Sequence, residues 1–298
     1  MSRVRVPGQA RRGHIAMLVF SALVAGSFSL GGLVANEIAP TALNAARFVI
    51  AAAVIGAVVM ARGQMQRTAF VAPWRYLVLG GLFAIYFVTM FEGLKTAPPV
   101  SAAAVFTLTP LMAAGFGWLL QRQVLTPRMA LALGIGAFGA LWVIFRADFA
   151  AMRAFEIGRG ESIFFWGCVA HAAYAPMVPR LNRGESPVVF TFGTLVAAAL
   201  VIIVYGAGDI LATDWSALSP LVWVTLFYIA IPASSVTFVL VQFAALRLPA
   251  SKVMAYTYLV PSWVICWEIA FGQPVPPALV LIGIAMTVLA LLLLLKSE

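Results

Sequence analysis

The sequence predicts an all-α integral membrane protein with ten transmembrane helices, arranged as two inverted repeats of five helices. Three observations support this fold class. Asp, Glu, Lys and Arg make up only 10% of the 298 residues, against about 25% in a soluble domain. Apolar runs of 16 to 21 residues recur along the chain, and about 20 residues are enough to cross a bilayer. The two halves of the chain are also similar to each other.

The expected transmembrane helices are ten apolar runs. Backbone groups cannot stay unpaired in lipid, so each run must be a helix or part of a closed barrel, and continuous rather than alternating apolar residues favour helices. In chain order the runs are Ile15–Val34, Leu43–Met60, Tyr76–Phe91, Ser101–Leu120, Ala130–Phe145, Ile163–Pro179, Val188–Tyr205, Leu221–Leu240, Ser251–Phe271 and Ala278–Leu295. The first run is too long for a signal peptide and lacks an Ala-x-Ala cleavage site, so we expect it to be retained.

Basic residues set the expected orientation. With the N-terminus in the cytoplasm, 14 of the 19 Lys and Arg residues fall in cytoplasmic segments, 4 fall outside, and Arg47 lies within a helix. Basic residues concentrate on the cytoplasmic side of membrane proteins. We therefore expect a multi-pass protein of the inner (cytoplasmic) membrane with both termini in the cytoplasm. The net charge of +9 then reflects orientation in a lipid bilayer, and no nucleic-acid partner is expected.

The halves of the chain are related by a shift of 151 residues, which aligns Pro110 with Pro261. The fourth and ninth runs are then counterparts. The expected units are 1–147 and 162–298, each of five helices, joined by an extracytoplasmic loop at 148–161. Because five is odd, the second unit enters the membrane from the opposite side, as in secondary transporters whose substrate site lies between inverted repeats. Accidental similarity between apolar helices is the alternative.

Four short stretches carry a family likeness: PTALNAARF at 40–48, GLKTA at 93–97, and LTP at both 108–110 and 125–127. They resemble the EamA module of the drug/metabolite transporter (DMT) superfamily, most nearly the YddG type of aromatic amino-acid exporter. The resemblance covers nearly the whole chain as two modules. It implies a carrier that exports aromatic or neutral amino acids and related metabolites by alternating access through a central cavity. No proton-coupling residue comes with it.

Polar and aromatic side chains within the runs are the candidate residues of that cavity, because polar groups are costly when they face lipid. Helical phase places most of them on shared faces of the third, sixth, eighth and ninth runs. They are Tyr86, Phe87, Thr107, His171, Tyr174, Tyr228, Ser235, Gln242, Tyr256 and Trp263. Aromatic rings stack on a flat apolar substrate, and Gln242 is placed to fix its polar end. The alternatives are that His171 is a packing residue and that the other rings belong to the aromatic belts at the membrane interfaces.

Pro110 and Pro261 lie inside the fourth and ninth runs and are the expected gating hinges. A mid-helix proline removes one N–H and frees the carbonyl four residues earlier, here those of Phe106 and Thr257. Such a site bends, or offers an acceptor to a substrate ammonium group. The alternative is a static kink.

Arg47 lies about two turns after Pro40, at the outer end of the second helix, and Glu92 and Glu268 end the third and ninth runs on the same side. An unpaired charge at that depth is costly, so we expect a structural ion pair between Arg47 and one of these glutamates. Binding of a substrate carboxylate by Arg47 is the alternative.

No sequence feature indicates an enzyme, a cofactor or a metal. A Walker A sequence and an HExxH helix are absent, and Cys168 and Cys266 make no metal or disulfide framework. We therefore expect a cofactor-free transporter that binds a small-molecule substrate. Glycines in the fifth and tenth runs favour packing within one chain, so a monomer is expected. A broader metabolite or cationic drug exporter is the nearer alternative, and an integral membrane enzyme the remote one.

Overall fold

The computed structural model describes residues 7–65, 67–154 and 157–296, and within those ranges the regular secondary structure is helical. Two short 3₁₀ helices, η1 (Arg67–Phe70) and η3 (Tyr256–Leu259), and one π-helix, η2 (Ile231–Val236), interrupt or connect the α-helices. The α-helices are α1 Pro7–Val34, α2 Pro40–Ala61, α3 Trp74–Leu94, α4 Pro99–Phe106, α5 Thr109–Gln121, α6 Pro127–Ile144, α7 Phe149–Ala154, α8 Arg159–Leu181, α9 Pro187–Tyr205, α10 Ala207–Ala212, α11 Pro220–Ala230, α12 Thr237–Ala245, α13 Ala250–Ala255, α14 Val260–Ala270 and α15 Ala278–Leu295.

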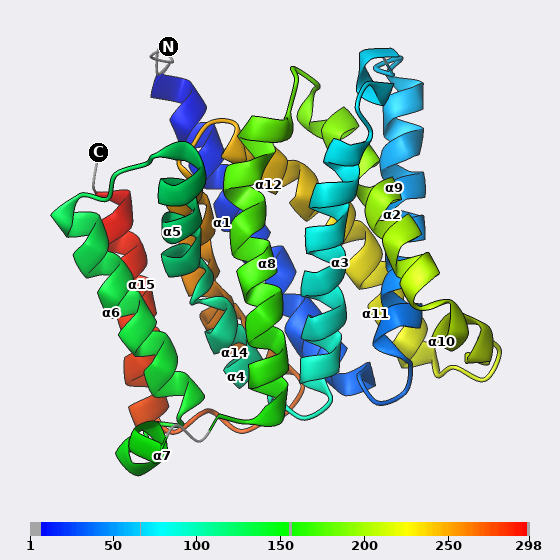
Figure 1. Cartoon of the computed structure of the whole chain (residues 1–298). Helices are drawn as coiled ribbons and strands as arrows, with labels where there is room; N and C mark the ends of the chain where they lie inside the picture. The colour runs from blue at the N-terminus through cyan, green and yellow to red at the C-terminus, as the bar shows by residue number, and fades with distance from the viewer. Residues whose placement is uncertain (1–6, 66, 155–156, 297–298) are drawn as a thin grey trace.

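Nine segments of the described chain are long and apolar enough to cross a membrane, and they correspond to every predicted run except the sixth. The sixth run forms α8, which is 23 residues long. It is less apolar because it carries His171, two prolines and charged residues near both ends. Figure 1 shows α8 running the length of the bundle between α3 and α5. The all-helical membrane fold is confirmed, while the count of ten crossings stays a prediction.

The ends of the described chain lie together. In Figure 1, α1 begins and α15 ends at the same end of the bundle, where the chain also turns after α2, α5, α8 and α12. These are the turns predicted to be cytoplasmic. The placement of both chain ends on one side of the bundle agrees with that prediction, and the choice of side still depends on the basic residues.

Three of the predicted runs are broken helices. The fourth is divided into α4 and α5 by a turn at Thr107 and Leu108, the ninth into α13 and α14 by η3, and the eighth into α11 and α12 by η2. Pro110 and Pro261 therefore lie in the first turns of α5 and α14. The prediction that they are mid-helix residues is wrong: at a helix start the missing N–H of proline leaves no helical hydrogen bond unmade.

The two carbonyls expected to be freed are occupied. The Phe106 carbonyl accepts a hydrogen bond from the Thr109 hydroxyl at 2.5 Å, and the Thr257 carbonyl accepts one from the N–H of Val260. Neither offers a free acceptor to a substrate. The breaks contact each other instead, because the hydroxyl oxygens of Thr109 and Thr257 lie 3.2 Å apart.

Glycines allow α6 and α15 to pack backbone against backbone at one edge of the bundle (Figure 1). A Cβ added to Gly139 would lie 2.6 Å from the carbonyl oxygen of Gly283, and a Cβ on Gly283 would lie 2.7 Å from that of Gly139. Small residues permit this approach between membrane helices. The expectation that glycines of the fifth and tenth runs serve packing within the chain is confirmed.

A buried ion pair ties the start of α3 to the loop between α8 and α9. Arg75 donates to the Glu185 carboxylate at 2.6 Å, and the two side chains are only 1% and 4% exposed. Arg75 also donates to the carbonyls of Val71, Ala72 and Leu181. Its guanidinium thus joins three chain segments at one end of the bundle.

We expect Gly139→Ala to destabilise the protein by about 1–3 kcal/mol, because the new methyl group meets backbone that cannot yield. The matched control is Gly134→Ala on the same helix, where nothing lies within 4 Å of an added Cβ; it should be neutral or stabilising by up to about 1 kcal/mol. Thermal unfolding in detergent measures both. Equal Tm values for the two variants would show that the α6–α15 contact is looser than described.

Acidification should weaken the tie made by Glu185. Burial alone raises the pKa of Glu185, but hydrogen bonds from Arg75 and from the Arg183 N–H outweigh it and hold the pKa below its ordinary value. The stabilisation is therefore complete above about pH 4.3, the ordinary value, and is lost as pH falls through the lower folded-state pKa. Tm measured from pH 7 to 3 should fall more for the wild type than for Glu185→Gln. Parallel curves would contradict this.

Candidate functional site

Seven buried rings from four helices form a continuous group, the aromatic cluster. Phe83 stacks on Tyr174 and contacts Phe238, each with ring centroids 4.0 Å apart, and Tyr86 stacks on His171 at 4.4 Å. Each ring is 3% exposed or less. The members are Phe83, Tyr86 and Phe87 of α3, Phe106 of α4, His171 and Tyr174 of α8, and Phe238 of α12.

Several polar atoms in and beside the aromatic cluster have no hydrogen-bond partner. They are both ring nitrogens of His171, the Tyr86 hydroxyl and Oε1 of Gln242. Gln242 is held by its other end, because its Nε2 donates to the Tyr174 hydroxyl at 2.7 Å. Buried polar atoms are nearly always hydrogen-bonded, and leaving one unpaired costs free energy. Four such atoms around one group of rings identify a place where a polar ligand would be stabilised.

Five of the ten predicted cavity residues therefore come together: Tyr86, Phe87, His171 and Tyr174 within the aromatic cluster, and Gln242 beside it. Thr107 and Ser235 are buried, but their hydroxyls bond to nearby backbone. The Thr107 hydroxyl donates to the Ala104 carbonyl at 2.6 Å, and that of Ser235 to the Ala230 carbonyl at 2.9 Å. These two hydroxyls are already satisfied.

The remaining three residues, Tyr228, Tyr256 and Trp263, lie along α1 instead. Each places its polar atom within hydrogen-bonding distance of that helix, and Trp263 is 38% exposed. Their partners are the Leu23 carbonyl at 2.9 Å, Nδ1 of His14 at 3.1 Å and the Ser21 hydroxyl at 3.3 Å, respectively. Helical phase predicted the faces but not which neighbour each face meets.

The predicted ion pair of Arg47 with Glu92 or Glu268 is wrong for the described part of the chain. Glu92 pairs with Lys95, three residues further on, at 2.8 Å. The described contacts of Arg47 include neither glutamate. The short distance along the helix favours the local Glu92–Lys95 pair, since residues three apart are neighbours on a helix surface.

Arg47 instead turns into the bundle and is 0% exposed. Its Nε donates to the Ser234 hydroxyl at 2.6 Å, its Nη2 to the Ala233 carbonyl at 3.1 Å, and its Nη1 to Oδ1 of Asn44 at 3.5 Å. The guanidinium carbon lies 3.8 Å from the centroid of the Phe87 ring. Arg47 is thus joined to the aromatic cluster through Phe87.

Two residues that hold Arg47, Ser234 and Asn44, were not among the predicted site residues. Ser234 belongs to the π-helix η2, whose second residue is Pro232. Because proline cannot donate a backbone hydrogen bond, it favours an irregular turn there. The proline ahead of two serines in an apolar run was the sequence signal for this feature.

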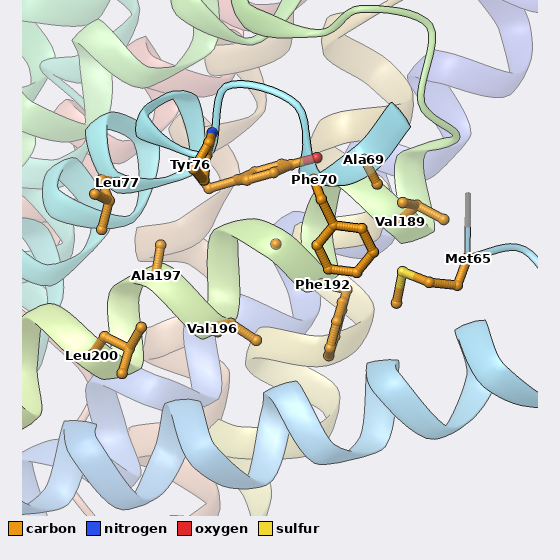
Figure 2. Close-up of a pocket in the computed structure, with 12 residues that line it drawn as sticks. Met65, Ala69, Phe70, Tyr76, Leu77, Val189, Phe192, Val196, Ala197 and Leu200 are labelled. Atoms are coloured by element: carbon orange, nitrogen blue, oxygen red, sulfur yellow. The ribbon is translucent and has the colours of Figure 1, made fainter. Parts of the chain in front are cut away.

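An apolar pocket of about 470 Å³ lies apart from the aromatic cluster, between η1, α3 and α9. Figure 2 shows Phe70, Tyr76 and Phe192 around it. No member of the aromatic cluster lines this pocket. The rings of the cluster are packed on one another, so the predicted central cavity is closed around its own side chains in this conformation.

No metal site is evident in the described residues, where His, Cys, Asp and Glu side chains do not gather in groups of three or more. The arrangement offers rings, amide and imidazole groups and one guanidinium. Such groups are suited to binding and orienting a ligand.

Comparison with known proteins identifies the family of the chain. The model of the EamA-like transporter family matches residues 11–145 and again residues 158–296. The chain belongs to the EamA-like transporter family. The two matched stretches contain α1–α6 and α8–α15. The predicted resemblance to the EamA module is thereby confirmed, whereas the nearer likeness to exporters of the YddG type stays a prediction.

A curated relative and a solved structure agree with this assignment. The chain is 26% identical over 269 residues to the uncharacterized transporter YyaM of Bacillus subtilis (strain 168), covering 88% of this chain and 87% of the relative. A crystal structure described only as that of a protein matches with a TM-score of 0.73 at 23% identity, over 98% of this chain and 99% of the other. That second likeness concerns the fold alone. The family and the relative are both described as transporters, so the protein is a multi-pass membrane transporter of small molecules.

We expect Tyr86→Phe to leave Tm unchanged or to raise it, because the substitution removes only a buried hydroxyl that has no partner. Tyr174→Phe is the matched comparison. It removes a hydroxyl that accepts from Gln242, so it should cost about 1–3 kcal/mol. Thermal unfolding in detergent distinguishes the two. Equal losses of stability would mean that the Tyr86 hydroxyl is hydrogen-bonded in the native protein.

Proposed function

We propose that this EamA-family protein is a secondary transporter of the inner membrane that exports aromatic or neutral amino acids and related metabolites. The aromatic cluster and Gln242 form its substrate site, and alternating access exposes that site to either side of the membrane in turn. No cofactor takes part, and the protein works as a monomer.

One observation carries this proposal: unpartnered polar atoms of His171, Tyr86 and Gln242 surround a set of stacked rings in the interior. Flat rings attract aromatic substrates by stacking. Polar atoms that lack partners bind the polar part of the same substrate, and the free energy lost by leaving them unpaired is regained on binding. An amino acid with an aromatic or apolar side chain combines both requirements.

The breaks in two helices support alternating access. The α4–α5 break and the α13–α14 break occur at positions related by the 151-residue shift, each just before Pro110 or Pro261. In secondary transporters, broken helices line the substrate site between inverted repeats. We therefore assign α8 as a tenth crossing, 1–147 and 162–298 as the two repeats, 148–161 as their extracytoplasmic connection, and the cytoplasm as the location of both termini.

In this mechanism the two breaks serve as gates. A helix interrupted before its proline has already given up continuous α-helical hydrogen bonding, so its halves can tilt relative to each other at the cost of fewer backbone hydrogen bonds than an unbroken helix would lose. The Thr109–Thr257 hydroxyl contact, at 3.2 Å, joins the two breaks. Through this contact, a movement at one break displaces the other.

A broader exporter of metabolites or cationic drugs is the second candidate function. The observation that favours it is the set of buried ring faces of Phe83, Tyr86 and Tyr174 in the aromatic cluster. Aromatic faces attract cations in general. A membrane enzyme has less support, because the two histidines do not share one site. His14 contacts Tyr256, whereas His171 stacks on Tyr86 in the aromatic cluster.

The proposal is tested by uptake into proteoliposomes of labelled Phe, Trp, Thr and a quaternary ammonium cation, with and without a pH gradient. We expect Phe and Trp to be taken up, and His171→Ala to reduce that uptake about tenfold, the loss expected from roughly 1.4 kcal/mol of binding free energy. Tyr256→Phe is the control, because Tyr256 belongs to η3 and contacts His14 of α1, outside the cluster.

The outcomes separate the candidate functions. Uptake of the cation with no amino-acid signal would replace the amino-acid assignment by the drug-exporter alternative. Full uptake by a folded His171→Ala variant would show that the aromatic cluster is not the substrate site.

A further inference from the structure

We propose that Arg47 binds the carboxylate of the transported substrate, so that the substrates are aromatic or apolar carboxylates and organic cations are rejected. This inference rests on the proposed transport function. It names the chemical group by which the site selects among small molecules.

The charge of Arg47 is not neutralised by the groups that surround it. Its described partners are a hydroxyl, a carbonyl and an amide oxygen, from Ser234, Ala233 and Asn44, and all three are uncharged. A guanidinium has five N–H donors, and these contacts use three of them. A buried cation without a counter-charge loses several kcal/mol of solvation, and neutral acceptors and aromatic faces return only part of this. The site is therefore electrostatically incomplete without an anionic ligand.

The guanidinium is held in a fixed orientation. Asn44 is itself anchored, because its Nδ2 lies 2.8 Å from the Pro40 carbonyl and 3.3 Å from the Phe87 carbonyl. Ala233 and Ser234 come from the π-helix η2, and π-helical turns occur frequently at functional sites. A planar fork fixed in this way is suited to two parallel hydrogen bonds with a carboxylate.

Arg47 and His171 lie at the two ends of one series of contacting rings. The guanidinium contacts Phe87, the Phe87 and Tyr86 centroids are 4.5 Å apart, and Tyr86 stacks on His171. A substrate with a carboxylate at one end and a flat apolar body fits this order.

The same geometry disfavours cations. An organic cation stacked on Phe87 would lie beside the Arg47 guanidinium with no acid between them, and like charges at short range in a buried site repel strongly. The cationic-drug alternative therefore requires Arg47 to be neutralised by a group that the described contacts of Arg47 do not include.

The experiment measures binding to purified protein in liposomes of three ligands that share a phenyl ring and differ in their charged groups: phenylalanine has a carboxylate and an ammonium, phenylalaninamide only the ammonium, and 3-phenylpropionate only the carboxylate. We expect the wild type to bind phenylalanine and 3-phenylpropionate, and to bind the amide at least 30-fold more weakly. Arg47→Gln should lose about 30-fold or more in affinity for both carboxylates. Arg47→Lys keeps the charge without the planar fork and should fall between the two.

Lys95→Gln is the matched control, since it removes the same charge from a partly exposed residue that pairs with Glu92. It should bind like the wild type. The Tm of Arg47→Gln should be equal to or above that of the wild type, because a lone buried charge has been removed. This second measurement shows that weak binding by the variant is not the result of misfolding.

Equal wild-type affinities for phenylalanine and its amide, or unchanged affinity in Arg47→Gln, would overturn the inference and leave the proposed transport function standing. Arg47-dependent binding of 2-oxoglutarate with no binding of any aromatic ligand would overturn the amino-acid assignment and support the role of Arg47.

Discussion

The need to satisfy every polar group without help from water constrains the whole structure. In lipid, an irregular backbone is tolerated only where it is buried in protein or lines a cavity. The breaks at Thr107–Leu108 and at η3 meet this condition because hydroxyl groups and local backbone donors occupy the loosened carbonyls. The interruptions therefore belong to the interior of the bundle, and they bring the two halves of the chain into contact there.

The polar groups at the centre of the bundle differ in their partners from those at the two breaks. The buried guanidinium of Arg75 pairs with the carboxylate of Glu185 and also donates hydrogen bonds to three backbone carbonyls. Arg47 has a comparable number of neutral partners but no acid among its described contacts. The two ring nitrogens of His171 and the Tyr86 hydroxyl have no hydrogen-bond partner. Single hydroxyls elsewhere in the described chain, such as those of Ser27, Thr225 and Tyr258, also lack partners. The centre differs because four such atoms and a guanidinium without an acid gather around one group of rings, and we interpret this gathering as the place of a ligand.

The membrane helices could be predicted from the sequence because the length of an apolar run is a local property of the chain. The sequence predicted α8 as a membrane helix despite its lower hydropathy. From their glycines it also predicted that the fifth and tenth runs pack closely within the chain, without indicating that they contact each other. It did not predict the direction of the Arg47 side chain, since residue depth says nothing about which neighbouring helix a long side chain meets. Helical phase placed Tyr256 and Tyr174 on similar faces, yet the first meets α1 and the second lies in the aromatic cluster. Only three-dimensional packing distinguishes them.

The closed aromatic cluster has a consequence for the transport cycle. Each buried polar atom without a partner costs about 1–3 kcal/mol, so the empty closed conformation carries a penalty that a bound substrate removes. A ligand shifts a conformational equilibrium only by the difference between its affinities for the two states. The carboxylate of a substrate at Arg47 and its polar groups near His171 would supply that difference by stabilising the closed form. Under the proposed function, closure with substrate bound is then favoured over closure of the empty site, and this bias makes the transporter change sides mainly when it is loaded.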